Sequence, residues 1–245
     1  MPGPDDSVSL FFPVYRDERT VRVVADKALR LLSSLQVPFE IVIVDDGSPD
    51  RSGAIADELA REHPEIRVVH HTKNLGYGAA VKSGIAASRH ALVCMTDGDD
   101  EYEVEDFRKL LKLREHYDLI ITFRYRKIYS STRIFVSWVY NSLLRFFFRT
   151  PFRDVSTGLR LVRRAVLDDL ELESTSPFIG AELAIKAMLK GYRVGEVGIQ
   201  TFPRSFGSGS STSIPNILAT MRDMWRIYHR IFSDAYELPS GRPRA

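Results

Sequence analysis

Two short acidic segments are the parts of this chain best suited to chemistry. Residues 96–101 read Thr-Asp-Gly-Asp-Asp-Glu and follow a short apolar run. Carboxylates two residues apart on a turn, here Asp97 and Asp99, can face one divalent cation such as Mg²⁺ or Mn²⁺ and leave sites open for phosphate oxygens. Such an ion would stabilise the charge that develops on a diphosphate leaving group. The alternative is a solvated acidic turn that caps the next helix.

The second acidic segment, 45–50, reads Asp-Asp-Gly-Ser-Pro-Asp and comes at the end of another apolar run. Gly47 and Pro49 indicate a tight turn, which places the two carboxylates at the edge of a sheet. A carboxylate there can accept hydrogen bonds from a nucleotide base or a ribose hydroxyl, whereas turn chemistry with an N-cap is the simpler alternative. Because acidic turns follow two separate apolar runs, we favour a nucleotide and metal site.

A glycine-containing segment, 74–84, is a weaker signal. It reads Asn-Leu-Gly-Tyr-Gly-Ala-Ala-Val-Lys-Ser-Gly. Glycine permits close backbone approach, and a helix N-terminus favours an anion. The spacing matches neither the dinucleotide-binding fingerprint nor the P-loop, so this segment by itself identifies no ligand.

The elements that must position these residues alternate in type along the first half of the chain. Apolar runs predict buried strands over 8–14, 39–44, 67–71, 90–96 and 118–123. Between them, helical spacing is found over 21–35, 53–62, 79–88 and 104–116. This alternation predicts an α/β fold with a mostly parallel twisted sheet and helices on both faces. Ligands of such folds bind at the carboxyl ends of the strands, where the polar clusters 15–18, 45–50 and 97–101 fall.

Two long helical segments, about 133–149 and 216–232, are predicted in the second half. The first is apolar nearly all round, apart from a narrow stripe at every fourth position, formed by Arg133, Ser137, Asn141, Arg145 and Arg149. Residues 119–153 include seven basic residues and no acidic one. We therefore favour contact of this helix with a membrane surface, with packing on the sheet or a homodimer contact as alternatives. The helix around Trp225 is interpreted as core.

Composition excludes several classes of protein. A chain of 245 residues buries one sizeable core, and a formal net charge of +2 predicts no nucleic-acid partner. The single Cys94 excludes an intrachain disulfide and a multi-cysteine zinc site. The start lacks the pattern of a secretory signal, and no window reaches the roughly 18 apolar residues of a spanning helix. We expect a cytoplasmic protein, with peripheral attachment to the inner face of the membrane as an option.

Together the motifs resemble a known family. Pro13-Val14-Tyr15 with Asp17-Glu18, the turn at 45–50, Asn74-x-Gly76-x-Gly78 and Asp97-Gly98-Asp99 occur in the order and spacing of inverting family 2 glycosyltransferases with the GT-A fold. Matches continue at Arg124-Tyr125, 154–160, Glu182, Arg204 and Gly207, and the branch looks most like the polyprenyl-phosphate (dolichol-phosphate) sugar transferases. The resemblance implies one GT-A catalytic domain over 1–235, with a nucleotide-sugar-binding half at 1–123, an acceptor-binding half at 124–235 and a disordered tail at 236–245.

The resemblance also implies roles for individual residues. It places Glu101 beside Asp97 and Asp99 at the metal, where relatives often carry a glutamine, and it places Arg124 and Arg204 at phosphates. The implied nucleotide-binding residues are Pro13, Tyr15, Asp17, Val44, Asp46, Lys82, Asp97, Gly98 and Arg204. The sequence departs from the family pattern twice. Glu101 adds a negative charge to the metal site, and the loop after Arg204 lacks the basic residue that often follows in dolichol-type members.

The implied reaction is inverting transfer, in which an acceptor oxygen attacks the anomeric carbon of a GDP- or UDP-linked sugar. A polyprenyl phosphate acceptor is already ionised and needs positioning more than deprotonation; the predicted clamp is Arg124, Arg126, Arg153 and Arg160. A hydroxyl acceptor would need a general base, for which Asp154 and Glu182 are the candidates. Their alternative roles are structural, Asp154 ordering its turn and Glu182 pairing with an arginine.

Two other classes of protein fit part of the pattern. A non-catalytic nucleotide-sugar-binding protein would bind the same donor without turnover. A nucleotidyltransferase shares the α/β fold and the acidic ligands, but it should carry a basic glycine-rich loop near its first strand, which this sequence lacks. The six histidines show no metal-ligand spacing and are predicted to be structural or surface residues.

Overall fold

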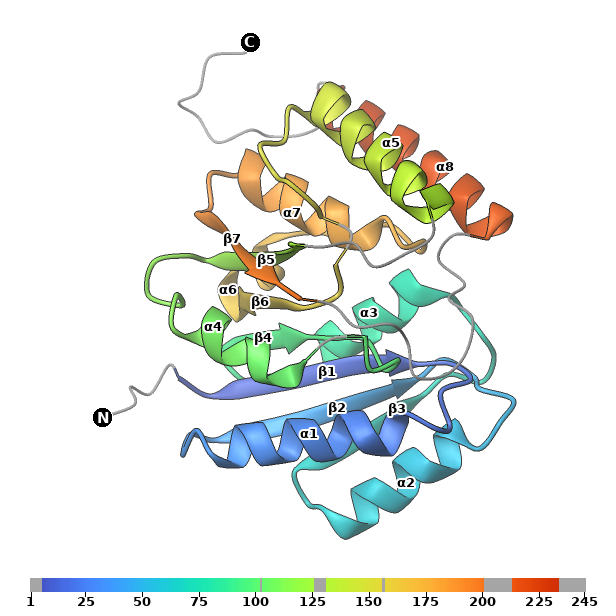
Figure 1. Cartoon of the computed structure of the whole chain (residues 1–245), viewed down its shortest axis with the longest axis vertical. Helices are drawn as coiled ribbons and strands as arrows, with labels where there is room; N and C mark the ends of the chain where they lie inside the picture. Colours follow the sequence, from blue (N-terminus) through green and yellow to red (C-terminus); the bar gives the residue numbers. More distant parts are fainter. Residues whose placement is uncertain (1–5, 102, 126–130, 156, 201–212, 234–245) are drawn as a thin grey trace.

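The fold is organised around one seven-stranded sheet (Figure 1). The computed structural model describes residues 6–101, 103–125, 131–155, 157–200 and 213–233. The strands lie in the order β3-β2-β1-β4-β6-β5-β7, and every adjacent pair is parallel except the two that β6 makes. Their bounds are β1 Val8–Val14, β2 Phe39–Asp45, β3 Ile66–His70, β4 Leu92–Met95, β5 Leu119–Arg124, β6 Arg160–Arg163 and β7 Val194–Ile199. The predicted mostly parallel α/β sheet is confirmed.

Helices cover both faces of the sheet, because strands such as β1 are apolar on both sides. Leu10 and Phe12 pack with α1, α2 and α4, whereas Phe11 between them faces α3 and α7. Cys94 is buried on the same side of the sheet as Leu10 and Phe12. The helices are α1 Val21–Ser33, α2 Ser52–Glu62, α3 Tyr77–Ala87, η1 Val104–Asp106, α4 Phe107–Leu111, α5 Ser131–Phe148, α6 Arg164–Asp169, α7 Ile179–Leu189 and α8 Ile214–Phe232.

One predicted helix is shorter than expected, and one helix of the structure was not predicted. The helix predicted over 104–116 is one 3₁₀ turn followed by the short α4, after which the backbone continues in tight turns in which Leu113 and His116 each donate to the carbonyl three residues earlier. Such turns keep an apolar spacing similar to that of an α-helix, so periodicity does not separate the two. Helix α6 was not predicted, because it starts directly after β6 and is only six residues long.

The direction of β6 determines which loops lie at the edge of the sheet that carries the acidic turns. Strands β1, β2, β4 and β5 are mutually parallel in the sheet, so the loops that follow them meet at one edge. Because β6 runs antiparallel to β4 and β5, its start lies at that same edge, with Arg160 opposite Met95 and Ile121. The segment 154–159 therefore joins the acidic turns from the other half of the chain.

Helices α5 and α8 lie side by side on the outside of the molecule (Figure 1), with the rings of Phe147 and Tyr228 5.3 Å apart. In the described part of the chain, nine of the thirteen exposed large hydrophobic residues belong to these two helices: Ile134, Phe135, Trp138, Phe146, Ile214, Leu218, Met221, Trp225 and Phe232. We call these nine residues the apolar surface. The interpretation of the Trp225 helix as core holds for one side, where Met224, Ile227 and Ile231 lie in the hydrophobic core beside the buried Asp223. Trp225 itself is 59% exposed, which corrects that interpretation for the other side.

The described helices include none that is long and apolar enough to span a membrane. Two residues of the polar stripe of α5, Asn141 and Arg133, point toward the inside of the molecule. Asn141 is buried, and Arg133 forms an ion pair with Glu101 of the acidic turn. The apolar surface therefore faces away from the sheet while part of the polar stripe faces the candidate site.

Candidate active site

The segment 75–77 joins the two acidic turns. Asp46 accepts hydrogen bonds from the backbone N–H groups of Leu75 (2.8 Å) and Gly76 (2.9 Å). The hydroxyl of the next residue, Tyr77, donates to Oδ1 of Asp97 at 2.9 Å. Gly76 has φ +92°, a conformation that glycine adopts without strain. Asp46 and Asp97 thus lie on either side of one short loop, in the segment that had looked like a weak signal in the sequence.

His71 completes the surroundings of Asp46. Its Nδ1 lies 2.7 Å from Oδ1 of Asp46, and its Nε2 lies 2.9 Å from Oγ of Ser83. Since a carboxylate can only accept, Nδ1 carries a proton and donates to Asp46. By lone-pair count, Oδ1 of Asp46 then accepts two bonds and Oδ2 accepts one, from Gly76. Oδ2 retains the capacity for one further N–H donor, such as that of a nucleotide base.

The end of β1 is fastened to the second acidic turn. A Cβ added to Gly98 would lie 2.8 Å from the carbonyl oxygen of Pro13, so only glycine permits this approach. Thr20 donates to the carbonyl oxygen of Gly98 at 2.7 Å. Tyr15, just beyond β1, is exposed, and Oδ2 of Asp17 accepts its backbone N–H at 3.0 Å. Pro13, Tyr15, Asp17 and Gly98 therefore share one end of the sheet, as predicted for a nucleotide site.

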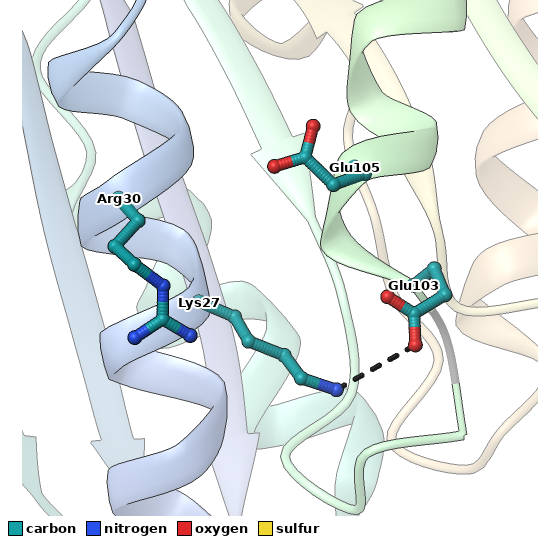
Figure 2. Close-up of a pocket in the computed structure, with 4 residues that line it drawn as sticks. All are labelled: Lys27, Arg30, Glu103 and Glu105. Carbon is teal, nitrogen blue, oxygen red and sulfur yellow. Dashed lines mark ion pairs between the residues drawn. The ribbon is translucent and has the colours of Figure 1, made fainter.

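The carboxylates of the second acidic turn point in different directions. Oδ1 of Asp99 accepts the backbone N–H of Glu101 at 3.1 Å, whereas Glu101 faces Arg133 at 3.5 Å. Asp100 has φ +59° and forms an ion pair with Lys27 on α1 at 2.8 Å. Lys27 also reaches Glu103 at 3.6 Å, across a pocket of about 190 Å³ that Arg30 and Glu105 help to line (Figure 2). None of these four lining residues is a predicted site residue, and the volume is below the roughly 300 Å³ of ordinary small-molecule sites.

Within the described ranges, no group of three or more His, Cys, Asp or Glu side chains could hold a metal ion. The predicted ligands Asp97, Asp99 and Glu101 therefore do not form a closed cage. The physical reason is that Tyr77 holds Asp97 on one side while Arg133 draws Glu101 to the other.

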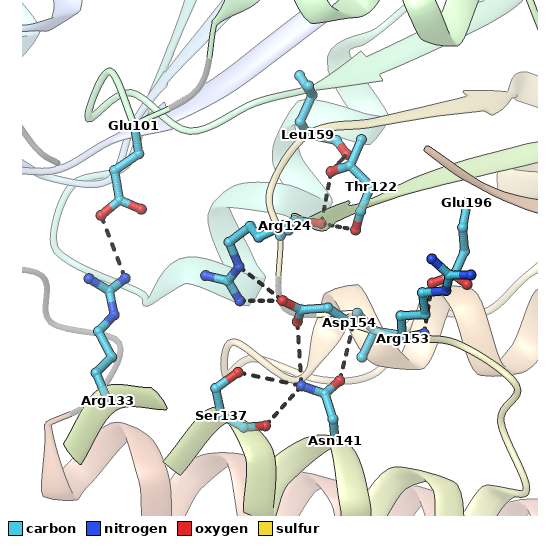
Figure 3. A network of polar contacts seen from close by, with 12 residues as sticks. Glu101, Thr122, Arg124, Arg133, Ser137, Asn141, Arg153, Asp154, Leu159 and Glu196 are labelled. Carbon is cyan, nitrogen blue, oxygen red and sulfur yellow. Dashed lines mark hydrogen bonds and ion pairs between the residues drawn. The ribbon is translucent and has the colours of Figure 1, made fainter. Parts of the chain in front are cut away.

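The loop before β6 brings the second half of the chain to these acids. A Cβ added to Gly158 would lie 2.3 Å from Oδ2 of Asp97, so the loop backbone sits directly against that carboxylate. Thr157 donates to the carbonyl of Thr122 at 2.6 Å, and Thr122 donates to the carbonyl of Leu159 at 2.9 Å. These buried bonds fix the loop to β5 (Figure 3).

Asp154 and Arg124 form a buried pair at the start of the same loop. Nε and Nη2 of Arg124 donate to Oδ2 of Asp154 at 2.9 and 2.7 Å, and both side chains are nearly inaccessible. Nδ2 of Asn141, on α5, approaches the other oxygen, Oδ1, at 3.4 Å (Figure 3). Asp154 is thus oriented through both oxygens, which gives a defined position to the carboxylate and to the guanidinium.

The comparison with known families agrees with this geometry. Residues 9–171 match the family model described as "Glycosyl transferase family 2". The chain belongs to glycosyl transferase family 2. The match covers the acidic turns, the 75–77 segment and the loop before β6, so the elements that meet at the sheet edge are those of a glycosyltransferase.

Individual relatives carry more specific names. Polyprenol monophosphomannose synthase of Mycolicibacterium smegmatis is 28% identical over 217 residues, which cover 83% of this chain and 80% of that protein. Dodecaprenyl-phosphate galacturonate synthase of Rhizobium johnstonii is 26% identical over 205 residues, covering 82% and 60%. This glycosyltransferase spans only about a third of the length of several other relatives.

A solved structure shares the fold. Glucosyl-3-phosphoglycerate synthase from Mycobacterium tuberculosis, in complex with Mn²⁺, uridine diphosphate and phosphoglyceric acid, superimposes with a TM-score of 0.72. The superposition covers 91% of this chain and 77% of that one at 17% identity. The predicted GT-A fold is confirmed at this level.

Four predicted site residues of the glycosyltransferase lie in structural surroundings instead. The guanidinium of Arg160 is buried and donates to the carbonyls of Val155, Thr157 and Gly180. Glu182 is completely buried, pairs with Lys186 at 2.7 Å and accepts the N–H groups of Glu173 and Ser174. These contacts favour a structural role over the predicted phosphate clamp for Arg160 and over the predicted base for Glu182. The predicted partner of Glu182 was an arginine, whereas in the structure its partner is Lys186.

The other two are Val44 and Lys82. The side chain of Val44 lies in the core beneath the sheet edge, so only its backbone is available for a nucleotide. Nζ of Lys82 lies 3.4 Å from the carbonyl oxygen of Glu173. Arg126 and Arg204 lie outside the described residues.

Two residues at this site, Asn141 and His71, have no functional role in the sequence predictions. Asn141 was noted only as part of the polar stripe of α5. The four-residue spacing of the stripe was the available signal for Asn141. For His71 the sequence gives no such signal. The pairing of β2 with β3 sets Asp45 opposite His70, and this register brings the next residues, Asp46 and His71, together.

We predict that Gly158→Ala lowers the kcat/KM of sugar transfer by about 10²-fold, because the added methyl would displace Asp97 or the loop that carries Asp154. Steady-state kinetics would measure the loss. Gly84→Ala is the matched control, since its methyl would meet the ring of Phe11 in the core instead. That variant should lose unfolding free energy while its folded fraction keeps normal kcat/KM; equal activity of the two variants would contradict the placement of Gly158.

We also predict a pH-dependent contribution of His70 to stability. Desolvation lowers the pKa of His70, but hydrogen bonds to Asp57 and Asp45 outweigh it and raise the pKa above its ordinary value of 6.5. A raised folded-state pKa stabilises the protein fully below 6.5, and this stabilisation is lost as the pH rises through the folded-state pKa. Urea denaturation of the wild type and His70→Gln should therefore differ more at pH 5.5 than at pH 8.5. A difference that does not change with pH would count against the two ion pairs.

Proposed function

We propose that this glycosyltransferase moves a sugar from a GDP- or UDP-linked donor to a polyprenyl phosphate at a membrane surface. The observation that carries the proposal is the contact of Gly158 with Asp97, which sets the Arg124–Asp154 pair beside the acidic turns. The names of the relatives support the acceptor, since two of them are synthases of polyprenol or dodecaprenyl phosphate sugars and another is an undecaprenyl-phosphate transferase.

The donor half follows from the residues at the ends of β1, β2 and β4. Asp46 would take an N–H of the nucleotide base at Oδ2, and the exposed ring of Tyr15 would lie against the nucleoside. Asp97, already oriented by Tyr77, and Asp99 would face the ribose and the diphosphate. Since backbone N–H groups and the Tyr77 hydroxyl already orient Asp46 and Asp97, this side of the site would need little rearrangement when a donor binds.

A divalent cation fits this turn only together with the donor. Mg²⁺ binds through one or two carboxylates completed by substrate phosphates. Asp99 and Glu101 are both buried and lie two residues apart in one turn, and either carboxylate could supply such a ligand, Glu101 by turning away from Arg133. When bound, the cation would neutralise charge on the diphosphate as it leaves. The solved structure of the mycobacterial synthase with Mn²⁺ and uridine diphosphate supports this arrangement through its fold.

The acceptor half depends on Arg124. Asp154 fixes the plane of its guanidinium through two hydrogen bonds, and a fixed guanidinium matches the geometry of a phosphate. A phosphate oxygen needs no base, so the task of this chain is to hold that oxygen in line with the anomeric carbon. Asp154 thereby acts through Arg124 rather than on the substrate.

Transfer to a hydroxyl is the second candidate. Its support is Asp154 itself, a carboxylate with hydrogen-bond partners at both oxygens, in the same loop as Gly158, whose backbone lies against Asp97. In that reaction Asp154 would take the proton of the acceptor hydroxyl. A non-catalytic nucleotide-sugar-binding protein is a further alternative, which turnover measurements separate from both.

The membrane part of the proposal rests on the apolar surface and its charges. Apart from Arg133, which pairs with Glu101, helices α5 and α8 carry four exposed arginines, Arg145, Arg222, Arg226 and Arg230, and one acidic residue, Asp223, which is completely buried. Exposed aromatic rings next to arginines are suited to the interface of an anionic bilayer. A homodimer contact through the same surface is the alternative. The cytoplasmic side of the membrane remains a prediction from the sequence.

The proposed function is tested with a panel of UDP- and GDP-sugars, with Mn²⁺ or Mg²⁺, and with polyprenyl phosphate in detergent. Sugar transfer into the lipid phase is the expected result with one donor of the panel. Thermal stabilisation by a donor without turnover would support the binding protein, and transfer to a hydroxyl compound alone would support the second candidate.

Asp99→Asn should reduce transfer by at least about 10²-fold while the unfolding midpoint stays close to that of the wild type, because the variant keeps the shape of the turn and loses the charge. Glu105→Gln is the control, an exposed acid shortly beyond the same turn. Near-normal turnover of Asp99→Asn with the cation present would contradict the assignment of Asp99 to the cation and diphosphate site.

Membrane contact has a direct optical readout, because the two tryptophans of the chain, Trp138 and Trp225, both belong to the apolar surface. Vesicles containing anionic lipid should shift their fluorescence emission to shorter wavelength, and added salt should reverse the shift. Trp138→Phe and Trp225→Phe separate the two helices, and Phe135→Ser should weaken binding whereas the exposed Val23→Ser on α1 should not. Unchanged emission at low salt, with a dimeric mass in solution, would support the homodimer instead.

A further inference from the structure

We infer that Asn141 is a positioning residue that ties helix α5 to the Arg124–Asp154 pair and thereby sets the place of the acceptor. The inference rests on the proposed function, since it assigns the acceptor to that pair. Neither the acidic motifs nor the family match points to Asn141; its contacts do.

The side chain of Asn141 is buried, and both its carbonyl oxygen and its amide nitrogen form contacts. Oδ1 accepts the backbone N–H of Val155 at 3.2 Å, and Nδ2 approaches Oδ1 of Asp154 at 3.4 Å. Nδ2 also donates to the carbonyl of Ser137 at 2.9 Å, one turn earlier in α5. One amide therefore holds two consecutive residues of the loop before β6 against α5 (Figure 3).

The position of Asp154 is set from two sides. Arg124, at the end of β5, binds Oδ2, and Asn141, from α5, lies at Oδ1. Loss of the Asn141 amide would remove the contact at Oδ1 of Asp154 and the acceptor for the N–H of Val155, so α5 would hold this loop less firmly. Arg124 would shift together with the carboxylate, because its Nε and Nη2 both donate to Oδ2. Loss of the amide is thus expected to move the charge that meets the acceptor and to leave the donor side unchanged.

The outer side of α5 gives this link its functional meaning. Phe135 and Trp138 of the apolar surface lie on the same helix and are more than half exposed, whereas Asn141 points inward. The helix that would rest on the bilayer is therefore the helix that orients Asp154. A lipid-linked phosphate held in that bilayer would meet Arg124 at a height set by α5.

The test uses full-length Asn141→Asp, which keeps an oxygen for the N–H of Val155 and replaces the donor toward Asp154 with a second carboxylate. At pH 8 the acceptor kcat/KM should fall by about 10²-fold, while the dissociation constant of UDP or GDP with Mn²⁺ changes less than about two-fold. Between pH 8 and pH 5.5 much of the loss should be recovered, because the new carboxyl then takes up a proton and donates again.

Ser142→Asp is the matched control, since it adds the same charge to α5 at the next position, where Ser142 contacts Arg145 rather than Asp154. It should show neither the acceptor defect nor the recovery at low pH. Asn141→Leu, which removes both contacts, should lose acceptor kcat/KM without recovery at any pH. If Asn141→Asp retains wild-type acceptor kinetics, or if donor binding and acceptor kinetics fall together without pH recovery, the inference is wrong. Failure of the wild type to transfer to polyprenyl phosphate would instead overturn the proposed function.

Discussion

Strand β6 runs antiparallel between β4 and β5, and this reversal is the constraint on which the candidate site depends. In a fully parallel sheet the loop before β6 would lie at the opposite edge, far from the acidic turns. The reversal brings 154–159 to the edge where β1, β2 and β4 end. The close contact that results, Gly158 against Asp97, is possible only because glycine has no side chain. Donor and acceptor residues from opposite halves of the chain meet as a consequence.

The acids at this edge are costly to bury, and the structure compensates each of them differently. Asp46 is satisfied by backbone N–H groups and His71, Asp97 receives the hydroxyl of Tyr77, and Asp154 faces Arg124. A buried carboxylate without such partners would destabilise the fold. Asp46 and Asp97 receive hydrogen bonds from N–H and O–H groups, whereas Asp154 pairs with an arginine. Carboxylates on the donor side and a guanidinium on the acceptor side suit a site that holds a cation with one substrate and a phosphate of the other.

Helices α5 and α8 connect the outside of the molecule to this site. Asp223 of α8 is buried and accepts the N–H groups of Thr175 and Ser176, and the carbonyl of Thr175 in turn accepts the N–H of Gly78 beside the donor site. On α5 the corresponding link is Asn141. Each helix thus buries one polar side chain among apolar ones, such as Leu144 of α5 and Ile227 of α8, and leaves aromatic rings exposed on its other side. Because a group of exposed large apolar side chains is typical of an interaction site, we assign these rings a surface to contact.

The sequence alone determined the alternation of strands and helices in the first half of the chain, the two long helices of the second half, the acidic turns at the strand ends and the family. These features are local, because a buried strand needs a continuous apolar run and a turn needs particular residues wherever the segment ends up. Only the tertiary structure decided that Arg160 and Glu182 are buried among structural partners, that Trp225 is exposed, that Glu101 turns to Arg133 and that Asn141 reaches Asp154. Each of these depends on contacts between residues distant in sequence or on which face of a helix meets the sheet, and helical spacing defines the faces of a helix without saying which one is covered.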